Sequence, residues 1–321
     1  MPYYNLKLCD LQYVFRVRLT IVLAMAFPLL SCHTQSTLRQ SSEPSMSEIQ
    51  YDVYGEGPSV MILLHGLGSN KKAWKKVVPY LEDSHKIYAL DLPKYLNTDD
   101  KTGVGISKYA ALVKSFIDKL PQSKAHIVGH SMGAQIAMHL GLNHPNNVLS
   151  LSLLAPAGIE QFSEADKNWF KTYVTKNYYL TLNDAAVKRS FDINFFGNAL
   201  PKDAQFMLED RMALKEDSVA YSRYIDYVLL SINSMLEEAV YQDLDQLQIP
   251  TLVLFGANDQ LIPNRLLHPG LNVEDILEKA QKIQSSNRLL VSEAGHFIQW
   301  DKPEEVASQI NKFIANLFTK K

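Results

Sequence analysis

Ser131 lies at the centre of the sequence Gly-His-Ser-Met-Gly, between Gly129 and Gly133. Residues 126–128 have the pattern of a short buried strand, whereas residues 132–142 carry apolar side chains at helical spacing. Glycines on both sides let strand and helix approach closely, while a strained backbone at the corner turns the serine hydroxyl outward. This context predicts a nucleophile elbow at Ser131. The alternative is a serine that caps an ordinary helix.

A serine nucleophile needs a base within hydrogen-bond reach, and the base needs an acid that orients it. His296 follows the last predicted strand and lies beside a glycine, so it is the expected base. His130 is a poor candidate because it is adjacent to Ser131, and neighbouring side chains on a strand point to opposite faces. Three carboxylates follow predicted strands, at the edge where parallel sheets bind ligands; they are Asp91, Glu160 and Asp259.

The composition is that of an ordinary globular protein, with 46% hydrophobic and 21% charged residues over 321 positions. A formal net charge of -2 provides no basic surface, which excludes nucleic-acid binding as a function. The sequence has no histidine pair at metal-ligand spacing, and neither a Gly-x-Gly-x-x-Gly nor a Walker loop. We therefore expect neither a metal nor a cofactor.

The beginning of the chain has the features of a signal peptide. Three basic residues precede the apolar run 19–30, which is short for a membrane span. The run ends in Leu-Leu-Ser-Cys, which resembles the bacterial lipobox, and that resemblance implies acylation of Cys32. Residues 1–31 are therefore predicted to be a lipoprotein signal peptide. Plain secretion and an uncleaved anchor are the alternatives.

Residues 32–47 are rich in Ser, Thr, Gln and Glu and predict a flexible tether. Such a tether would hold a folded body at a membrane through the lipid on Cys32, which predicts a location in the bacterial cell envelope. His33 stands where an aspartate usually retains bacterial lipoproteins inside, so the outer membrane is favoured over the inner one.

The remaining chain predicts an α/β fold built from two segments and an insertion. Strand and helix patterns alternate from residue 59 to residue 143, after a first hairpin formed by residues 48–54 and 59–64, and this alternation predicts a parallel sheet with helices on both faces. Helical patterns rich in large apolar residues replace the alternation in residues 159–246. We predict a helical cap there, with residues 48–158 and 247–321 forming the core. A helix is also expected at residues 74–81.

The sequence His-Gly-Leu-Gly at residues 65–68 stands ahead of the Ser131 pentapeptide in an order and spacing that resemble the α/β-hydrolase family. The chain is similar to bacterial lipases and esterases of the Gly-His-Ser-Met-Gly type. The resemblance implies that the backbone N–H groups of Leu67 and Met132 bind the oxyanion. It also selects Asp259 as the triad acid, in the order serine, acid, histidine, with Glu160 as the alternative if Asp259 points away. One departure is Lys-Tyr-Leu at residues 94–96, where family members often have a glycine-rich turn.

These residues predict a serine hydrolase that cleaves small hydrophobic carboxylic esters, as an esterase or lipase. The runner-up is a carbon–carbon bond hydrolase of the meta-cleavage type, which shares this fold and triad. Gln299, Trp300 and Arg189 favour it, while the predicted leader argues against it. A non-catalytic binding lipoprotein is a third possibility, but it would need none of the triad residues. Ser131 excludes a dehalogenase, which uses aspartate at the elbow.

Overall fold

The computed structural model describes residues 49–93 and 103–319. The predicted signal peptide, the tether, Cys32 and the segment 94–96 lie outside these residues. Within the described ranges, no helix combines the length and the apolar character needed to cross a membrane.

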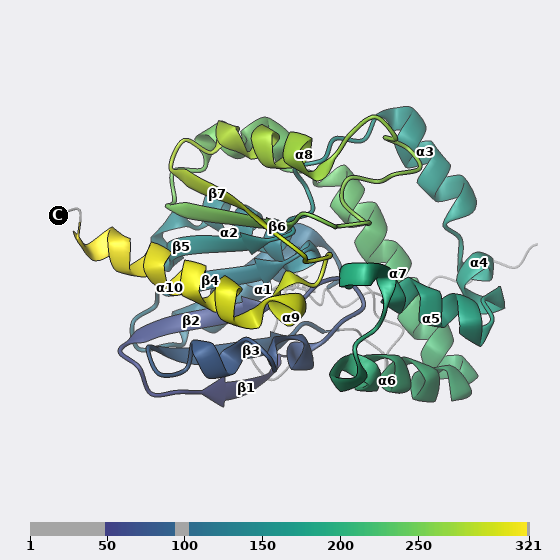
Figure 1. Ribbon diagram of the computed structural model, residues 1–321, viewed down its shortest axis with the longest axis horizontal. Helices are drawn as coiled ribbons and strands as arrows, with labels where there is room; N and C mark the ends of the chain where they lie inside the picture. Colours follow the sequence, from purple (N-terminus) through teal and green to yellow (C-terminus); the bar gives the residue numbers. More distant parts are fainter. Residues whose placement is uncertain (1–48, 94–102, 320–321) are drawn as a thin grey trace, which may run out of the picture. The chain divides into compact units, whose positions relative to one another are not determined.

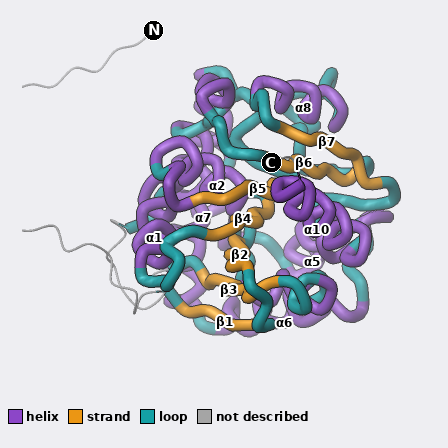
Figure 2. The backbone as a smooth tube through the Cα atoms, turned by 90° about the vertical axis from the view of Figure 1, so that its left-hand side faces the viewer, coloured by secondary structure: helices purple, strands orange, loops and turns teal. Residues whose placement is uncertain are grey.

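The centre of the molecule is a sheet of seven strands in the order β1-β3-β2-β4-β5-β6-β7. All neighbouring pairs are parallel except β1 with β3. Figure 2 shows the strands stacked in this order. The α/β fold with a mostly parallel sheet is therefore confirmed. The strands are β1 (Gln50–Tyr54), β2 (Ser59–Leu64), β3 (His85–Asp91), β4 (Ala125–His130), β5 (Val148–Leu154), β6 (Thr251–Gly256) and β7 (Ser286–Val291).

The predicted hairpin of the first two strands is wrong, because β1 pairs with β3 and not with β2. Both edges of β2 are occupied, by β3 and by β4. The intervening turn instead packs against the chain that enters β3. A Cβ atom on Gly55 would lie 2.2 Å from the carbonyl oxygen of Glu82, and Gly55 has a φ of 66°, so this close approach requires glycine.

Helices cover both faces of the sheet. Successive side chains of β2 point to opposite faces, so this strand packs against both helix layers. Ile62 and Leu64 belong to the core beneath α1 (Ile106–Asp118), α2 (Met132–Asn143) and α8 (Val273–Lys279). Met61 and Leu63 belong to the opposite core, beneath α10 (Pro303–Thr319) and the short α9 (Ile298–Asp301). Figures 1 and 2 show α1 and α10 on opposite sides of the strands.

The helix expected at residues 74–81 is replaced by two short 3-10 helices, Lys71–Trp74 and Val78–Tyr80. Pro79 stands at the start of the second one. Proline has no backbone N–H and clashes with the preceding turn, so it prevents one continuous α-helix.

Five helices between β5 and β6 lie together beyond one end of the strands, within the segment predicted as a cap (Figure 1). Four of them begin at a residue whose side chain accepts a backbone N–H of the first turn: Ser163, Thr175, Asn183 and Asp217. The five are α3 (Glu164–Tyr173), α4 (Lys176–Thr181), α5 (Asp184–Asp192), α6 (Gln205–Glu216) and α7 (Ser218–Glu237). The apolar stripe of α7 is buried, so this helix joins the cap to the core beneath α1 and α2.

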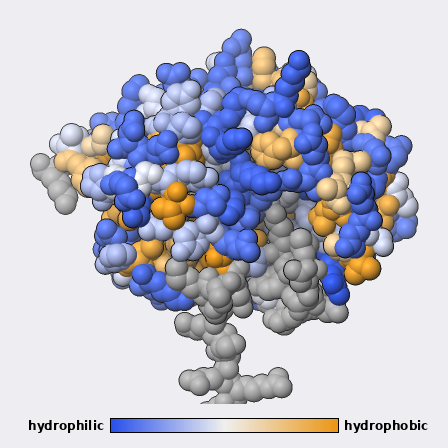
Figure 3. All heavy atoms as spheres, turned by 90° about the horizontal axis from the view of Figure 1, so that it is seen from below, coloured by the Kyte–Doolittle hydropathy of each residue, from blue (hydrophilic) through white to orange (hydrophobic). Residues whose placement is uncertain are grey.

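Figure 3 shows the face seen from below Figure 1. Hydrophilic residues cover most of the part that is described, and apolar residues form small separate patches. Such scattered apolar groups are normal for a protein surface.

Candidate active site

Ser131 lies on the sharp corner between β4 and α2, with φ 54° and ψ −116°. This backbone conformation is strained for a residue with a side chain. The flanking glycines allow the backbone around this corner to pack closely. A Cβ on Gly129 would lie 2.4 Å from the carbonyl oxygen of Gly133, and one on Gly133 would lie 2.1 Å from that of Leu64. The Ser131 hydroxyl makes no capping hydrogen bond to α2, which removes the helix-cap alternative.

Asp259 and His296 meet beyond the ends of β6 and β7. The Nδ1–H of His296 donates to Oδ2 of Asp259 at 2.8 Å. The other oxygen, Oδ1, accepts the backbone N–H groups of Leu261 and Ile262, at 2.8 and 3.1 Å. Both carboxylate oxygens are therefore paired, and the bond at Nδ1 makes Nε2 of His296 the acceptor nitrogen.

Ser131 and His296 both line a cavity of about 350 Å³, although no hydrogen bond joins the serine hydroxyl to the imidazole of these two described residues. Catalytic hydrogen bonds of this kind often tighten only when substrate binds. The cavity is largely apolar, and core and cap residues both contribute to its wall. Its apolar lining includes Leu67, Phe162, Phe170, Ile232, Met235, Leu236, Leu261 and Phe297.

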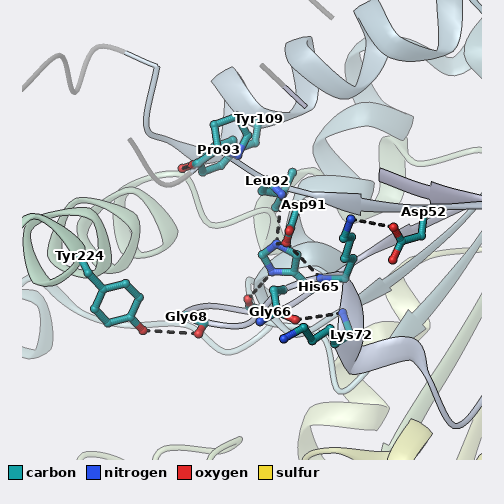
Figure 4. A network of polar contacts seen from close by, with 12 residues as sticks. Asp52, His65, Gly66, Gly68, Lys72, Asp91, Leu92, Pro93, Tyr109 and Tyr224 are labelled. Carbon is teal, nitrogen blue, oxygen red and sulfur yellow. Dashed lines mark hydrogen bonds and ion pairs between the residues drawn. The ribbon is translucent and has the colours of Figure 1, made fainter. Parts of the chain in front are cut away.

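The loop after β2 holds the peptide that links Gly66 to Leu67. The carbonyl oxygen of Gly66 accepts Nδ1–H of His65 at 2.8 Å and the N–H of Ser69 at 3.2 Å. His65 is held in turn, because its Nε2 accepts the N–H of Leu92 at 3.1 Å (Figure 4). In a planar trans peptide the N–H points away from the carbonyl oxygen, so fixing the Gly66 oxygen also fixes the Leu67 N–H.

Met132 is the first residue of α2, so its N–H has no acceptor within the helix. It lies directly after Ser131, at the positive end of the helix dipole. The geometry suits the predicted oxyanion roles of the Leu67 and Met132 amides, and the roles themselves stay a prediction.

The cap also holds this loop, through contacts that carried no sequence signal. Arg211 of α6 donates from Nη2 to the carbonyl oxygen of Gly68 at 2.9 Å, and its guanidinium lies 4.2 Å from the ring centre of Tyr224. The Tyr224 hydroxyl of α7 reaches the same oxygen at 3.4 Å (Figure 4). Burial raises the pKa of Tyr224, and the charge of Arg211 lowers it in part, so this hydroxyl is a donor at neutral pH.

His130 packs behind the proposed base. Its ring centre lies 4.8 Å from that of His296 and 4.5 Å from that of Phe297. Its Nε2–H donates to the backbone carbonyl of His296 at 3.0 Å. Burial, followed by the charge of His296, lowers the pKa of His130 well below its ordinary value, so the ring is neutral and supports the backbone of His296.

The other two candidate acids are engaged elsewhere. Asp91 accepts the N–H of Lys71 at 3.1 Å and lies 3.7 Å from Nε2 of His65. Glu160 accepts Nδ1–H of His268 at 2.5 Å. Burial raises the pKa of Glu160, and the hydrogen bond from His268 opposes that effect. Sequence reasoning missed His268, which lies in an irregular segment without a motif.

Among residues 49–93 and 103–319, no group of three or more His, Cys, Asp or Glu side chains is arranged to hold a metal ion.

Three known proteins are similar in sequence to most of this chain. The dihydrolipoyllysine-residue acetyltransferase component of the acetoin cleaving system of Pseudomonas putida is 27% identical over 269 residues, which cover 82% of this chain and 65% of that protein. This chain thus spans less than two thirds of that component. Monoacylglycerol lipase ABHD6 of Rattus norvegicus is 24% identical over 275 residues, covering 82% of this chain and 77% of that protein.

A third relative is 2-hydroxy-6-oxononadienedioate/2-hydroxy-6-oxononatrienedioate hydrolase 1 of Pseudomonas putida. It is 24% identical over 284 residues, covering 84% of this chain and 92% of that protein. The fold is shared with a crystal structure of a membrane phospholipase A, a bacterial virulence factor, with a TM-score of 0.66 at 22% identity, covering 84% of this chain and 82% of that one.

The family model for the alpha/beta hydrolase fold matches residues 59–303, from the first parallel strand to the start of α10. This span contains the elbow, the loop after β2, the Asp259–His296 pair and the helices between β5 and β6. The chain therefore belongs to the alpha/beta hydrolase family.

Proposed function

We propose that this protein is a serine hydrolase that cleaves carboxylic esters with hydrophobic acyl groups. The observation that carries the proposal is the 2.8 Å hydrogen bond between His296 and Asp259, beside a largely apolar cavity that Ser131 and His296 both line. The likeness to a monoacylglycerol lipase points the same way.

In this mechanism His296 Nε2 takes the proton of the Ser131 hydroxyl as its oxygen attacks the ester carbonyl. The Leu67 and Met132 N–H groups stabilise the oxyanion. His296 then gives the proton to the leaving alcohol, and an acyl-enzyme remains. Water, deprotonated by His296, releases the acid and restores Ser131. Asp259 holds the imidazole with Nδ1 protonated throughout.

The cavity suggests the size of the substrate. Its volume of about 350 Å³ is near the lower end of the ~300–1,000 Å³ found for ligand clefts. Esters of short or medium acyl chains therefore suit it better than long-chain lipids. Phe162 and Phe170 of the cap side and Leu261 of the core supply apolar contacts for such chains.

The carbon–carbon hydrolase alternative has support from one relative, whose name describes such a substrate. The residues that favoured it do not support it here. Gln299, Trp300 and Arg189 are all absent from the lining of the cavity, and Trp300 instead donates to Asp203 at 3.1 Å.

A panel of nitrophenyl esters of increasing acyl length, assayed beside a vinylogous diketone, tests the proposal. We expect turnover of short and medium esters and little cleavage of the diketone. Preferential cleavage of the diketone would establish the carbon–carbon reaction. Turnover of neither class would favour a binding protein.

The lipid anchor is part of the proposal. Acylation of Cys32 would keep the enzyme in the bacterial envelope, preferably at the outer membrane. Palmitate should label the wild type and not Cys32→Ala, whereas an unlabelled secreted product would overturn the anchor without touching the chemistry.

A further inference from the structure

The cavity that Ser131 and His296 line also has the carboxylate of Glu160 in its wall. Glu160 follows β5 and is only 4% exposed. Its Oε1 takes both donors that reach the carboxylate, which are Nδ1–H of His268 at 2.5 Å and the N–H of Asn264 at 2.8 Å. The other oxygen, Oε2, has no hydrogen-bond donor among the described residues.

His268 cannot easily turn to serve that second oxygen. Its Nε2 lies 3.6 Å from Oδ2 of Asp166 on α3, and its ring centre lies 5.1 Å from that of Phe162. The imidazole is thus hydrogen-bonded at Nδ1, with Asp166 near its other nitrogen and Phe162 beside the ring. This arrangement fixes the orientation of the Glu160 carboxylate, so Oε2 is the atom left for a bound molecule.

A carboxylate oxygen that faces a cavity without a protein donor is satisfied by water, so a ligand that displaces the water needs a donor of its own at that oxygen. A hydroxyl brings one donor and can accept from a neutral neighbour, and the cavity lining offers such a neighbour in Asn264, which lies beside Glu160. An ammonium would bring three donors to one open oxygen, and a substrate carboxylate would be repelled.

We propose that Oε2 of Glu160 accepts a hydrogen bond from a hydroxyl group of the substrate, so that the enzyme prefers esters that carry a free hydroxyl. This inference rests on the proposed ester hydrolase function and narrows its substrate class. The hydroxyl can belong to the alcohol part, as in a glycerol ester, or to the acyl part, as in a hydroxy acid.

Three matched esters separate these sources: propyl butyrate, 1-butyrylglycerol and propyl 3-hydroxybutyrate. For the wild type we expect kcat/KM for one hydroxylated ester to exceed that for propyl butyrate by about tenfold or more, as for a hydrogen bond to a charged group. Glu160→Gln presents an N–H₂ group in place of Oε2 and should abolish that preference, so kcat/KM falls more for the preferred hydroxylated ester than for propyl butyrate.

Two further variants serve as a second test and as a control. Glu160→Asp withdraws the carboxylate by one methylene and should also lose the preference, which covers the case that Glu160→Gln does not fold. Glu164→Gln changes an acid on α3 whose side chain is 79% exposed, and it should retain the preference.

Equal kcat/KM for all three esters in the wild type would overturn the inference, and so would equal losses for all three in the variants. Those results would leave ester hydrolysis itself intact. Hydrolysis of none of the three by the wild type would instead contradict the proposed function.

Discussion

The cavity is lined by one member of each of two carboxylate–histidine pairs, His296 and Glu160, and the pairs differ in which atom is left open. In Asp259–His296 both carboxylate oxygens are paired, and Nε2 of the imidazole has no hydrogen-bond partner among the described residues. In Glu160–His268 the imidazole is contacted at both nitrogens, and one carboxylate oxygen has no donor within the described chain. In the two proposals above, the first pair moves a proton and the second accepts a hydrogen bond from the substrate.

The local backbone explains this difference. Asp259 lies in a tight turn where two successive N–H groups converge on its Oδ1, which leaves Oδ2 for the histidine. Glu160 receives one backbone N–H, and it shares an oxygen with the His268 bond. Identical chemical groups thus acquire different properties through the donors around them.

The largest expected effect comes from removing the hydroxyl that His296 of the first pair is proposed to deprotonate. Ser131→Ala should lower kcat for nitrophenyl butyrate by up to ~10⁶-fold, because acyl-enzyme formation is lost. A fluorophosphonate should label the wild type at Ser131, as mapped by peptide mass spectrometry. Labelling at another serine would remove the mechanism.

Asp259→Asn should lower kcat by about 10⁴-fold, because the amide favours the wrong imidazole tautomer. Glu160→Gln is the matched comparison and should cost far less for propyl butyrate, because no hydrogen bond joins Glu160 to Ser131 or His296. Steady-state kinetics on the two purified variants make the comparison. A near-normal Asp259→Asn with an inactive Glu160→Gln would exchange the roles of the two pairs.

The cap contacts the loop that carries the proposed oxyanion donor Leu67 through Arg211. Arg211→Met removes the donor to Gly68 and should lower kcat by about tenfold to a hundredfold with little change in KM, less than the ~10²–10³ lost when an oxyanion donor is removed outright. Arg189→Met, at an exposed arginine of α5, is the control and should be silent. A rise in KM alone would show that Arg211 shapes the cavity rather than the loop.

The smallest effect concerns stability. Burial raises the pKa of Glu160 above its ordinary value of 4.5, so folding favours the protonated form. The stability from this group is fully present below pH 4.5 and is lost as the pH rises through the folded-state pKa. Glu160→Gln should therefore gain in free energy of unfolding relative to wild type as pH rises, measured by urea unfolding across that range. A difference independent of pH would mean that the hydrogen bonds to Glu160 offset its burial.

Local patterns determined the elbow and the layered fold. The change from a strand to a helix around Ser131, and the glycines beside it, are properties of a few adjacent residues. The placement of Asp259 and His296 after strands predicted one common edge, because the carboxyl ends of parallel strands meet there. These features depend on periodicity and backbone geometry, which can be read along the chain.

Only the tertiary structure decided which carboxylate meets which histidine. Asp259 and Glu160 both follow strands. Turns and loops bring each of them to its histidine, which lies 37 positions away in the sequence for Asp259 and 108 for Glu160. The pairing of β1 with β3 and the contact of Arg211 with Gly68, 143 positions apart, are likewise long-range. Such contacts depend on how side chains pack in space, and packing between distant segments leaves no periodic trace in the sequence.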